Sequence, residues 1–440
     1  MDKITKFLEE KVMPVAGKIA SQRHLSALRD AMVLTIPFII IGSVFLILAN
    51  LPIPAYIDYL TAHPKIKTAL LYPFNGTFNL VALIATFGVG YRLAESYKVD
   101  PLASGAVALC SYFVVTPSTI FTVDKMVTTA MNVNYFSSQG LFVGLLIAIL
   151  STEIYRRIVQ KDIVIKMPEG VPPTVAKSFT TVIPGFIAII TVWIIRLLVE
   201  NLTTFGSVHN IVGKLLQQPL TNIGTSLVGT IIVFFLINLL WTIGLHGSVI
   251  ANSVILPIWL QLTSENATAF AAGQPVDHIV TAEFRYLIFI GGSGATLGLV
   301  LAMVFLSKSK QMKQLGRLAI GPGLFNINEP LLFGLPIVFN PTMWIPFLIT
   351  PIVTVLITYL SMDYGLVAKP IGVLPPGTTP TLINGYLMTG SVSGVILQLV
   401  LFVTSFVIYF PFFKIMDNQK YKEEQTTLTN QDESKILKVN

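Results

Sequence analysis

Long stretches without a charged residue constrain this chain more than any other feature of its sequence. Several of them match the roughly 20 residues that an α-helix needs to cross the hydrocarbon core of a bilayer. Charged residues make up only 12% of the chain, about half of the roughly 25% found in soluble domains. We therefore expect lipid to be the solvent of most of this protein. The charge-free stretches lie at residues 31–57, 68–91, 101–123, 126–152, 178–195, 215–264, 286–307, 330–362 and 370–413.

The pattern predicts helices rather than a membrane β-barrel. A barrel would show segments of about ten residues with alternating polarity, and no such alternation persists here. Lys and Arg gather between the apolar stretches, and the positive-inside rule places such loops, together with both termini, in the cytoplasm. The sequence thus predicts an all-α polytopic protein of an inner membrane. The basic clusters lie at residues 3–29, 156–177, 308–317 and 414–422.

The arrangement of these features divides the chain into five parts. An apolar face at Ile4, Leu8, Val15 and Ile19 predicts an amphipathic helix on anionic lipid. A second helical pattern at 208–216 indicates an amphipathic linker between two halves. We expect the following parts: an N-terminal helix (1–30), a half with spans at 31–52, 71–91, 102–122, 137–155 and 179–199 (31–200), the linker (201–223), a substrate-binding half (224–415) and a cytoplasmic tail (416–440).

The second half contains one more apolar segment than the expected membrane topology allows. Between the basic loop at 308–317 and a cytoplasmic C-terminus an even number of crossings is required, yet three apolar segments follow. The segment 321–341 holds three glycines and four prolines, so we expect it to turn back within the membrane. A second broken stretch, 370–380, is rich in proline. Because irregular backbone at membrane depth needs protein or a wet cavity around it, we expect the binding site here.

Glu329 is the strongest candidate site residue, because it is the only acid between Arg317 and Asp363. A charge in this setting costs at least about 2.5 kcal/mol, so it needs a partner, a cavity or a proton. Asn326 and Asn328 stand beside it, and carboxylates with amides are suited to holding sugar hydroxyl groups. The alternative is a structural acid that pairs with freed backbone N–H groups or a distant lysine.

His246 is the only histidine in the charge-free stretch 215–264, and Gly244 and Gly247 flank it. Alone it would more often be a core histidine, but a buried acid in the same half favours a functional role. Trp241 could stack on a sugar ring or belong to an interfacial belt.

Other classes of function find no support. The basic residues follow membrane orientation, so nucleic acid is not an expected partner, and we expect no cofactor or metal. The single cysteine, Cys110, allows no disulfide, and the sequence contains no P-loop or nucleophile elbow. Glu283 with Arg285, like Arg92 with Glu95, is interpreted as a short-range pair near a span end.

The run NINEPLLFGLPIVFNP at residues 326–341 resembles the IIC component of the lactose, cellobiose and chitobiose branch of the phosphotransferase system (PTS). The stretch WTIGLHG at 241–247 and the chain length agree. The resemblance implies about ten spans, two re-entrant hairpins, and a homodimer formed through the first half. It also implies a separate IIB protein whose phosphocysteine phosphorylates the sugar 6-hydroxyl, with IIA upstream.

By this resemblance, Glu329 and His246 hold the hydroxyl that receives phosphate, with Glu329 as proton acceptor, and Asn328 contacts sugar. Thr378 and Thr379 of the second hairpin are also expected at the substrate. The chain departs from the family pattern at Gly377, where a tryptophan is usual. A β-linked disaccharide of the cellobiose, chitobiose or lactose class is expected, but the missing aromatic platform leaves a different glycoside open.

Two other functions remain open from the sequence. In an ion-coupled secondary transporter, Glu329 and His246 would titrate and drive uptake without phosphoryl transfer. A sensor would bind sugar without moving it.

Overall fold

The computed structural model describes residues 18, 21–51, 53–123, 126–168, 170–335, 337 and 340–439. Apart from residues 18, 21 and 22, the predicted amphipathic helix at 2–22 lies outside this part of the chain. Helices dominate the described residues, whose only sheet is a two-stranded hairpin. The predicted all-α, polytopic class is thereby confirmed.

The first half contains helices at all five predicted span positions. Helix α3 passes close to the second half, and α7 packs between α3, α8 and α9. The elements are α3 (Arg23–Ala49), α4 (Pro54–Ala62), α5 (Pro64–Leu70), α6 (Tyr72–Phe78), α7 (Val81–Ser96), α8 (Pro101–Val115), β1 (Ser118–Val123), β2 (Met126–Met131), η2 (Val133–Phe136), η3 (Ser138–Gly140), α9 (Leu141–Gln160) and α10 (Pro173–Leu202).

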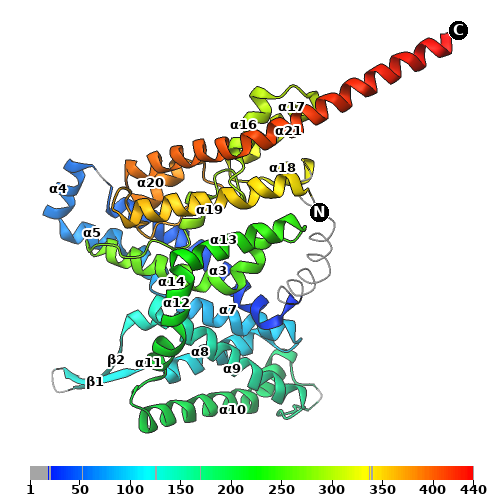
Figure 1. Ribbon diagram of the computed structural model, residues 1–440. Coiled ribbons are helices and arrows are strands. Elements are labelled where there is room, and N and C mark those ends of the chain that lie inside the picture. The colour runs from blue at the N-terminus through cyan, green and yellow to red at the C-terminus, as the bar shows by residue number, and fades with distance from the viewer. Residues whose placement is uncertain are drawn as a thin grey trace.

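The predicted span at 102–122 is wrong beyond Val115, where a β-hairpin replaces the helix. Pro117 disfavours helical backbone at the residue before it, and Thr116 is accordingly extended. The residues that follow are rich in Thr, Val and Ile, which suit strands. Strands β1 and β2 pair antiparallel from Ser118 opposite Met131 to Val123 opposite Met126, and the hairpin projects from the side of the bundle (Figure 1).

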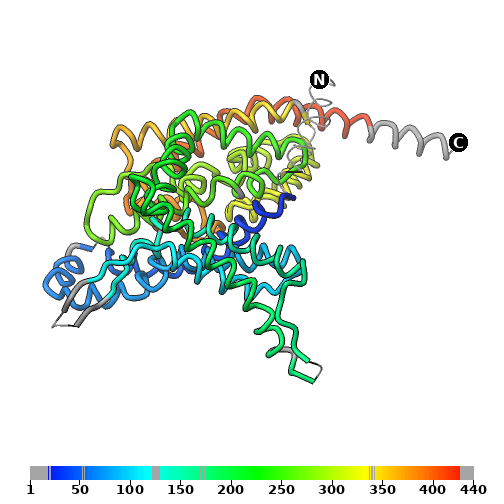
Figure 2. The backbone as a smooth tube through the Cα atoms, turned by 90° about the horizontal axis from the view of Figure 1, so that it is seen from below, coloured from blue at the N-terminus to red at the C-terminus, as the bar shows by residue number. Residues whose placement is uncertain are grey.

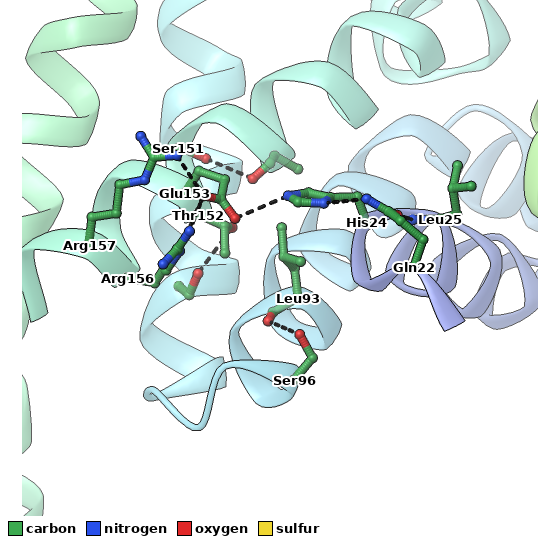
Figure 3. A network of polar contacts seen from close by, with 12 residues as sticks. Gln22, His24, Leu25, Leu93, Ser96, Ser151, Thr152, Glu153, Arg156 and Arg157 are labelled. Carbon is green, nitrogen blue, oxygen red and sulfur yellow. Dashed lines mark hydrogen bonds and ion pairs between the residues drawn. The ribbon is translucent and has the colours of Figure 1, made fainter. Parts of the chain in front are cut away.

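A polar network joins the start of α3 to the end of α9 (Figure 3). The side chain of His24 bonds that of Glu153 at 3.0 Å, and Glu153 also forms ion pairs with Arg156 at 2.7 Å and Arg157 at 3.3 Å. Two of the predicted basic clusters, those at 3–29 and 156–177, therefore meet on one side of the molecule through these residues.

The linker and the second half follow. The predicted linker helix at 208–216 is present as part of a longer helix, Val208–Thr225, with a π-helical turn at Gly213–Gln217, and the axis bends by 75° between it and Leu227–Thr242. The elements are α11 (Val208–Val212), η4 (Gly213–Gln217), α12 (Gln218–Thr225), α13 (Leu227–Thr242), α14 (Gly247–Ala271), α15 (Phe284–Ile288), α16 (Leu297–Leu306), α17 (Lys310–Leu324), α18 (Glu329–Gly334), α19 (Pro341–Asp363), α20 (Ile383–Thr389) and α21 (Val392–Val439).

Both predicted breaks in the second half are present as interruptions of helix. The first separates α17 from α18 at 325–328, and the second leaves 366–382 without helix. A third irregular stretch, 289–296, was missed by the sequence analysis. Three of its glycines, Gly291, Gly292 and Gly294, have positive φ angles, which side chains disfavour.

Among the described helices, five are long and apolar enough to cross a membrane, or six if the bent pair after residue 208 forms one span. Shorter or more polar helices complete the bundle. The two halves form two lobes that pack against each other where α3 meets α14, and α21 extends beyond them (Figures 1 and 2). Between the lobes, the main-chain N–H of Leu374 donates to the buried hydroxyl of Ser43 on α3 at 3.1 Å.

Candidate functional site

A cavity of about 280 Å³ lies in the second half, where the broken segments converge. Its wall contains five of the seven predicted site residues. The ends of α13 and α14, the residues around α15, the 289–296 stretch and the break before α18 all contribute. The lining residues are Ile237, Trp241, His246, Ser248, Val249, Asn252, Arg285, Tyr286, Phe289, Gly292, Ser293, Asn326, Asn328, Glu329 and Gly377.

His246 occupies the turn between α13 and α14. Its Nδ1 accepts the N–H of Val249 at 3.3 Å and so caps α14. Because a neutral imidazole that accepts at one nitrogen carries its proton on the other, Nε2 is the donor. The Trp241 ring lies 4.3 Å from the imidazole, centroid to centroid. Gly247 is required for this turn, since a Cβ there would come within 1.9 Å of the Ile237 carbonyl oxygen.

Glu329 is the first residue of α18, and its half-buried side chain faces the cavity. An acid is favoured at a helix N-terminus by the exposed N–H groups there. No cation lies within ion-pair distance of it in the described residues. The carboxylate is therefore available to a ligand, and the structural alternative of a lysine partner finds no support in this part of the chain.

Asn326 forms hydrogen bonds with the cavity wall through both the nitrogen and the oxygen of its side-chain amide. Its Nδ2 donates to the carbonyls of Gly377 at 3.2 Å and Thr379 at 2.9 Å, and its Oδ1 accepts the N–H of Gly291 at 3.1 Å. Asn326 has φ +60°, a conformation that asparagine tolerates better than most residues. It thus ties all three irregular stretches together.

Asn328 binds the 289–296 stretch from the same turn. Its Nδ2 donates to the Ser293 carbonyl at 2.6 Å and to the Thr296 hydroxyl at 3.1 Å. A Cβ on Gly292 would lie 2.6 Å from the Asn328 Cγ, so the glycine permits this close approach. Asn328 is nearly buried, and these contacts position Glu329, the next residue.

The interpretation of Glu283 and Arg285 as a short-range pair is wrong. Glu283 is fully buried and accepts the Thr263 hydroxyl at 2.6 Å. Arg285 instead lines the cavity, where it donates to Asn252 at 3.3 Å and lies 4.4 Å from the centroid of the Tyr286 ring. The two side chains separate because they lie two residues apart, at the irregular start of a very short helix. The sequence feature that could have indicated these roles is the presence of two charged residues in an otherwise apolar stretch.

Gly377 lines the cavity, whereas Thr378 and Thr379 are not among its lining residues. A Cβ on Gly377 would lie 2.9 Å from Cε1 of Tyr286, so the tyrosine ring occupies the space beside it. The aromatic surface on this side of the cavity therefore comes from Tyr286, which the sequence analysis did not select. Thr379 contributes its main-chain carbonyl, the acceptor of the Asn326 amide.

Together these groups offer one free carboxylate, one guanidinium, an imidazole, amides and the aromatic rings of Trp241, Tyr286 and Phe289 around a small space. Such a mixture suits a neutral solute with many hydroxyl groups, because each hydroxyl both donates and accepts. A polar cavity built from interrupted helices within an apolar helical bundle is typical of membrane transport proteins.

Comparison with known proteins identifies the particular family. Residues 29–351 match the family described as phosphotransferase system, EIIC. The chain is 52% identical to the putative permease IIC component YwbA of Bacillus subtilis (strain 168), over 96% of this chain and 98% of that protein. It is 51% identical to the PTS system cellobiose-specific EIIC component of Geobacillus stearothermophilus, over 98% of each chain. The protein belongs to the EIIC family of the phosphotransferase system.

A solved structure gives the same fold. The crystal structure of the transporter ChbC, the IIC component from the N,N'-diacetylchitobiose-specific phosphotransferase system, is 53% identical in sequence. It superimposes with a TM-score of 0.90 over 95% of this chain and 99% of that one. The resemblance noted in the run at 326–341 is thus confirmed, and the protein is a bacterial membrane permease component.

Proposed function

We propose that this IIC component binds a β-linked disaccharide in the cavity around Glu329 and carries it into the cytoplasm, where phospho-IIB phosphorylates the sugar 6-hydroxyl. The observation that carries the proposal is that Glu329 has no cation partner and shares one cavity with His246 and Arg285. Relatives named for cellobiose and lichenan support this substrate class. IIC components work with IIB and IIA proteins, and we propose that a separate IIB protein supplies the phosphoryl group.

The proposed chemistry assigns the proton to Glu329. The sugar 6-hydroxyl oxygen attacks phosphorus on the phosphocysteine of IIB, so an O–P bond forms while the S–P bond breaks and the thiolate leaves. The hydroxyl proton passes to the Glu329 carboxylate, which acts as general base. His246 donates its Nε2–H to the same hydroxyl oxygen or its neighbour and holds it in line. Arg285 and Asn252 bind further hydroxyl groups.

The division of labour follows the two lobes. We propose that residues 31–200 form the scaffold and the interface of a homodimer, and that residues 224–415 carry the sugar. The linker at 201–223 joins them, and both termini, including the tail at 416–440, lie in the cytoplasm. The joining of two basic clusters through His24 and Glu153 supports placing the N-terminus and the loop after α9 on one side. Thr378 and Thr379 remain proposed substrate contacts for a state in which the second break approaches the sugar.

The test adds radiolabelled cellobiose, chitobiose or lactose to membranes containing the protein, with and without purified phospho-IIB. Sugar 6-phosphate formed only when both proteins are present supports group translocation and begins to identify the substrate. Accumulation of unmodified sugar that depends on an ion gradient and not on IIB would instead establish a secondary transporter.

A further inference from the structure

Two carboxylates of α21 hold the N-terminal end of α17. Asp417 accepts the main-chain N–H groups of Lys308 at 2.9 Å and Ser309 at 3.0 Å, together with the Ser307 hydroxyl. Glu424, two turns further along α21, accepts three more hydrogen bonds. Its donors are the Ser309 hydroxyl at 2.7 Å, the Lys310 N–H at 3.0 Å and the Gln311 N–H at 2.8 Å.

These contacts satisfy donors that a helix cannot satisfy by itself. The first N–H groups of any α-helix have no partner within it, and a negative charge at that end is favoured by the helix dipole. Bonds from N–H groups to carboxylates are stronger than those between neutral groups. Asp417 is fully buried. The clamp formed by Asp417 and Glu424 therefore fixes where α17 begins relative to α21.

The opposite end of α17 leads directly into the cavity. Its last residue, Leu324, precedes the turn that carries Asn326, Asn328 and Glu329. Fifteen residues of helix span about 22 Å at 1.5 Å per residue, so α17 is a short rod with the clamp at one end and the site at the other.

Helices α16 and α21 complete a frame around this rod. Helix α16 starts beside the 289–296 stretch, which bonds Asn326 and Asn328, and ends at the clamp. Helix α21 contacts the same stretch, because Tyr409 donates its hydroxyl to the Gly294 carbonyl at 2.8 Å and Ser405 donates to that of Ala295. A Cβ on Gly298 would lie 2.5 Å from the Phe406 nitrogen, so α16 and α21 are in close backbone contact.

We infer that Asp417 and Glu424 are positioning residues for the sugar site: by anchoring α17 to α21 they set the location of Asn328 and Glu329. Neither touches the cavity. The inference rests on the proposed function for its kinetic consequence, but its structural consequence exists without any sugar. Loss of the clamp lets α17 shift along its axis, and a displacement of about 1 Å at a reacting group can cost up to a hundredfold in rate.

The test uses the purified full-length chain with Asp417→Asn and, as a milder change at a less buried position, Glu424→Gln. Glu423→Gln is the matched control, because Glu423 neighbours Glu424 and pairs with Lys420 of α21 itself at 2.8 Å. Hydrogen exchange without sugar is measured first. We expect faster exchange at 291–296 and 325–329 in both clamp variants and not in the control. A change confined to 307–311, or an equal change in the control, would overturn the inference.

Phosphorylation with phospho-IIB then separates positioning from partner docking. We expect about tenfold lower kcat/KM for the sugar, with the KM for phospho-IIB unchanged. A raised KM for phospho-IIB with normal sugar kinetics would show that the clamp surface docks IIB and would overturn the positioning role. If the wild-type chain phosphorylates no sugar, the proposed function fails, while the exchange result still decides the inference.

Discussion

The side chain of Asn326 donates a hydrogen bond to the main-chain carbonyl of Thr379 across 53 residues of sequence, at 2.9 Å. This bond, with those to Gly377 and Gly291, makes the cavity wall from three segments that have no regular structure of their own. The wall therefore depends on the side-chain amide of Asn326, whose nitrogen donates and whose oxygen accepts hydrogen bonds.

Replacing Asn326 should weaken the site in a way that separates conformation from hydrogen bonding. Asn326→Gly tolerates the positive φ angle but loses the three bonds to Gly291, Gly377 and Thr379 and a longer one from the Thr381 hydroxyl at 3.4 Å, whereas Asn326→Ala also adds backbone strain. At about 1 kcal/mol for each bond, we expect Asn326→Gly to lower the free energy of unfolding by about 2–3 kcal/mol and Asn326→Ala by more. Thermal unfolding of the purified variants measures both. Equal stability of Asn326→Ala and wild type would contradict the assigned role.

Glu329→Gln should leave the fold intact and remove the reaction. The carboxylate has no cation partner in the described structure, so the isosteric amide breaks no ion pair there. Loss of a general base typically costs about 10²–10⁴-fold in rate, and we expect a fall in sugar phosphorylation of that size. The assay is formation of sugar 6-phosphate at saturating phospho-IIB, with size-exclusion chromatography to verify folding. Wild-type rates in this variant would remove Glu329 from the mechanism.

His246 has two roles that different substitutions can separate. Asparagine is a favourable helix N-cap, so His246→Asn should retain the cap on α14 while removing the Nε2 donor. His246→Ala loses both and should cost about 1 kcal/mol of stability in addition. We therefore expect weak sugar binding in both variants, measured by isothermal titration calorimetry, but a lowered melting temperature only in His246→Ala. Normal sugar affinity in His246→Asn would limit the histidine to its capping role.

We expect the Tyr286 ring to provide the aromatic contact with the sugar that a tryptophan at position 377 provides in the family pattern. Tyr286→Ala removes the ring beside Gly377 and the surface under Arg285. An aromatic contact contributes about 1 kcal/mol beyond buried area, so we expect the sugar Kd to rise about fivefold. Tyr286→Phe should retain most of the affinity. Tyr364→Ala, at an exposed ring that does not line the cavity, is the control. A Kd unchanged in Tyr286→Ala would show that the second sugar ring lies elsewhere.

The sequence was informative where a residue differs in polarity or in helix propensity from the residues around it. Glu329 and His246 are polar groups in apolar stretches, and the prolines and glycines at 321–341 and 370–380 mark interrupted helix, so both the breaks and these two cavity-lining residues could be selected from the sequence. The positions of Arg285 and Tyr286 in the cavity wall could not be predicted, because the direction of side chains at the edge of a short helix depends on tertiary contacts. The glycines at 291–294 were not selected as site residues from the sequence, although they have positive φ angles and their stretch forms part of the cavity wall.

The hairpin at 118–131 shows a different limit. Its strands, Ser118–Val123 and Met126–Met131, contain no charged residue and continue the charge-free stretches 101–123 and 126–152, so the absence of charge alone cannot tell them from helix. The decisive features were local: Pro117 ends α8, and a run of β-branched residues follows. Length and the absence of charge identified the spans, because a helix needs about 20 apolar residues to cross the membrane, whereas a short apolar strand meets no such requirement.

The hydrogen bond from the Leu374 N–H to the Ser43 hydroxyl holds the two lobes together at one point. Its donor is a main-chain N–H, so side-chain substitution in the second broken stretch cannot remove it short of introducing proline. Any sliding of one lobe past the other must transfer that buried N–H from the Ser43 hydroxyl to another acceptor, because a buried N–H without a partner costs about 1–3 kcal/mol. The Ser43 hydroxyl therefore stabilises this arrangement of the two lobes against any other that leaves the Leu374 N–H without an acceptor.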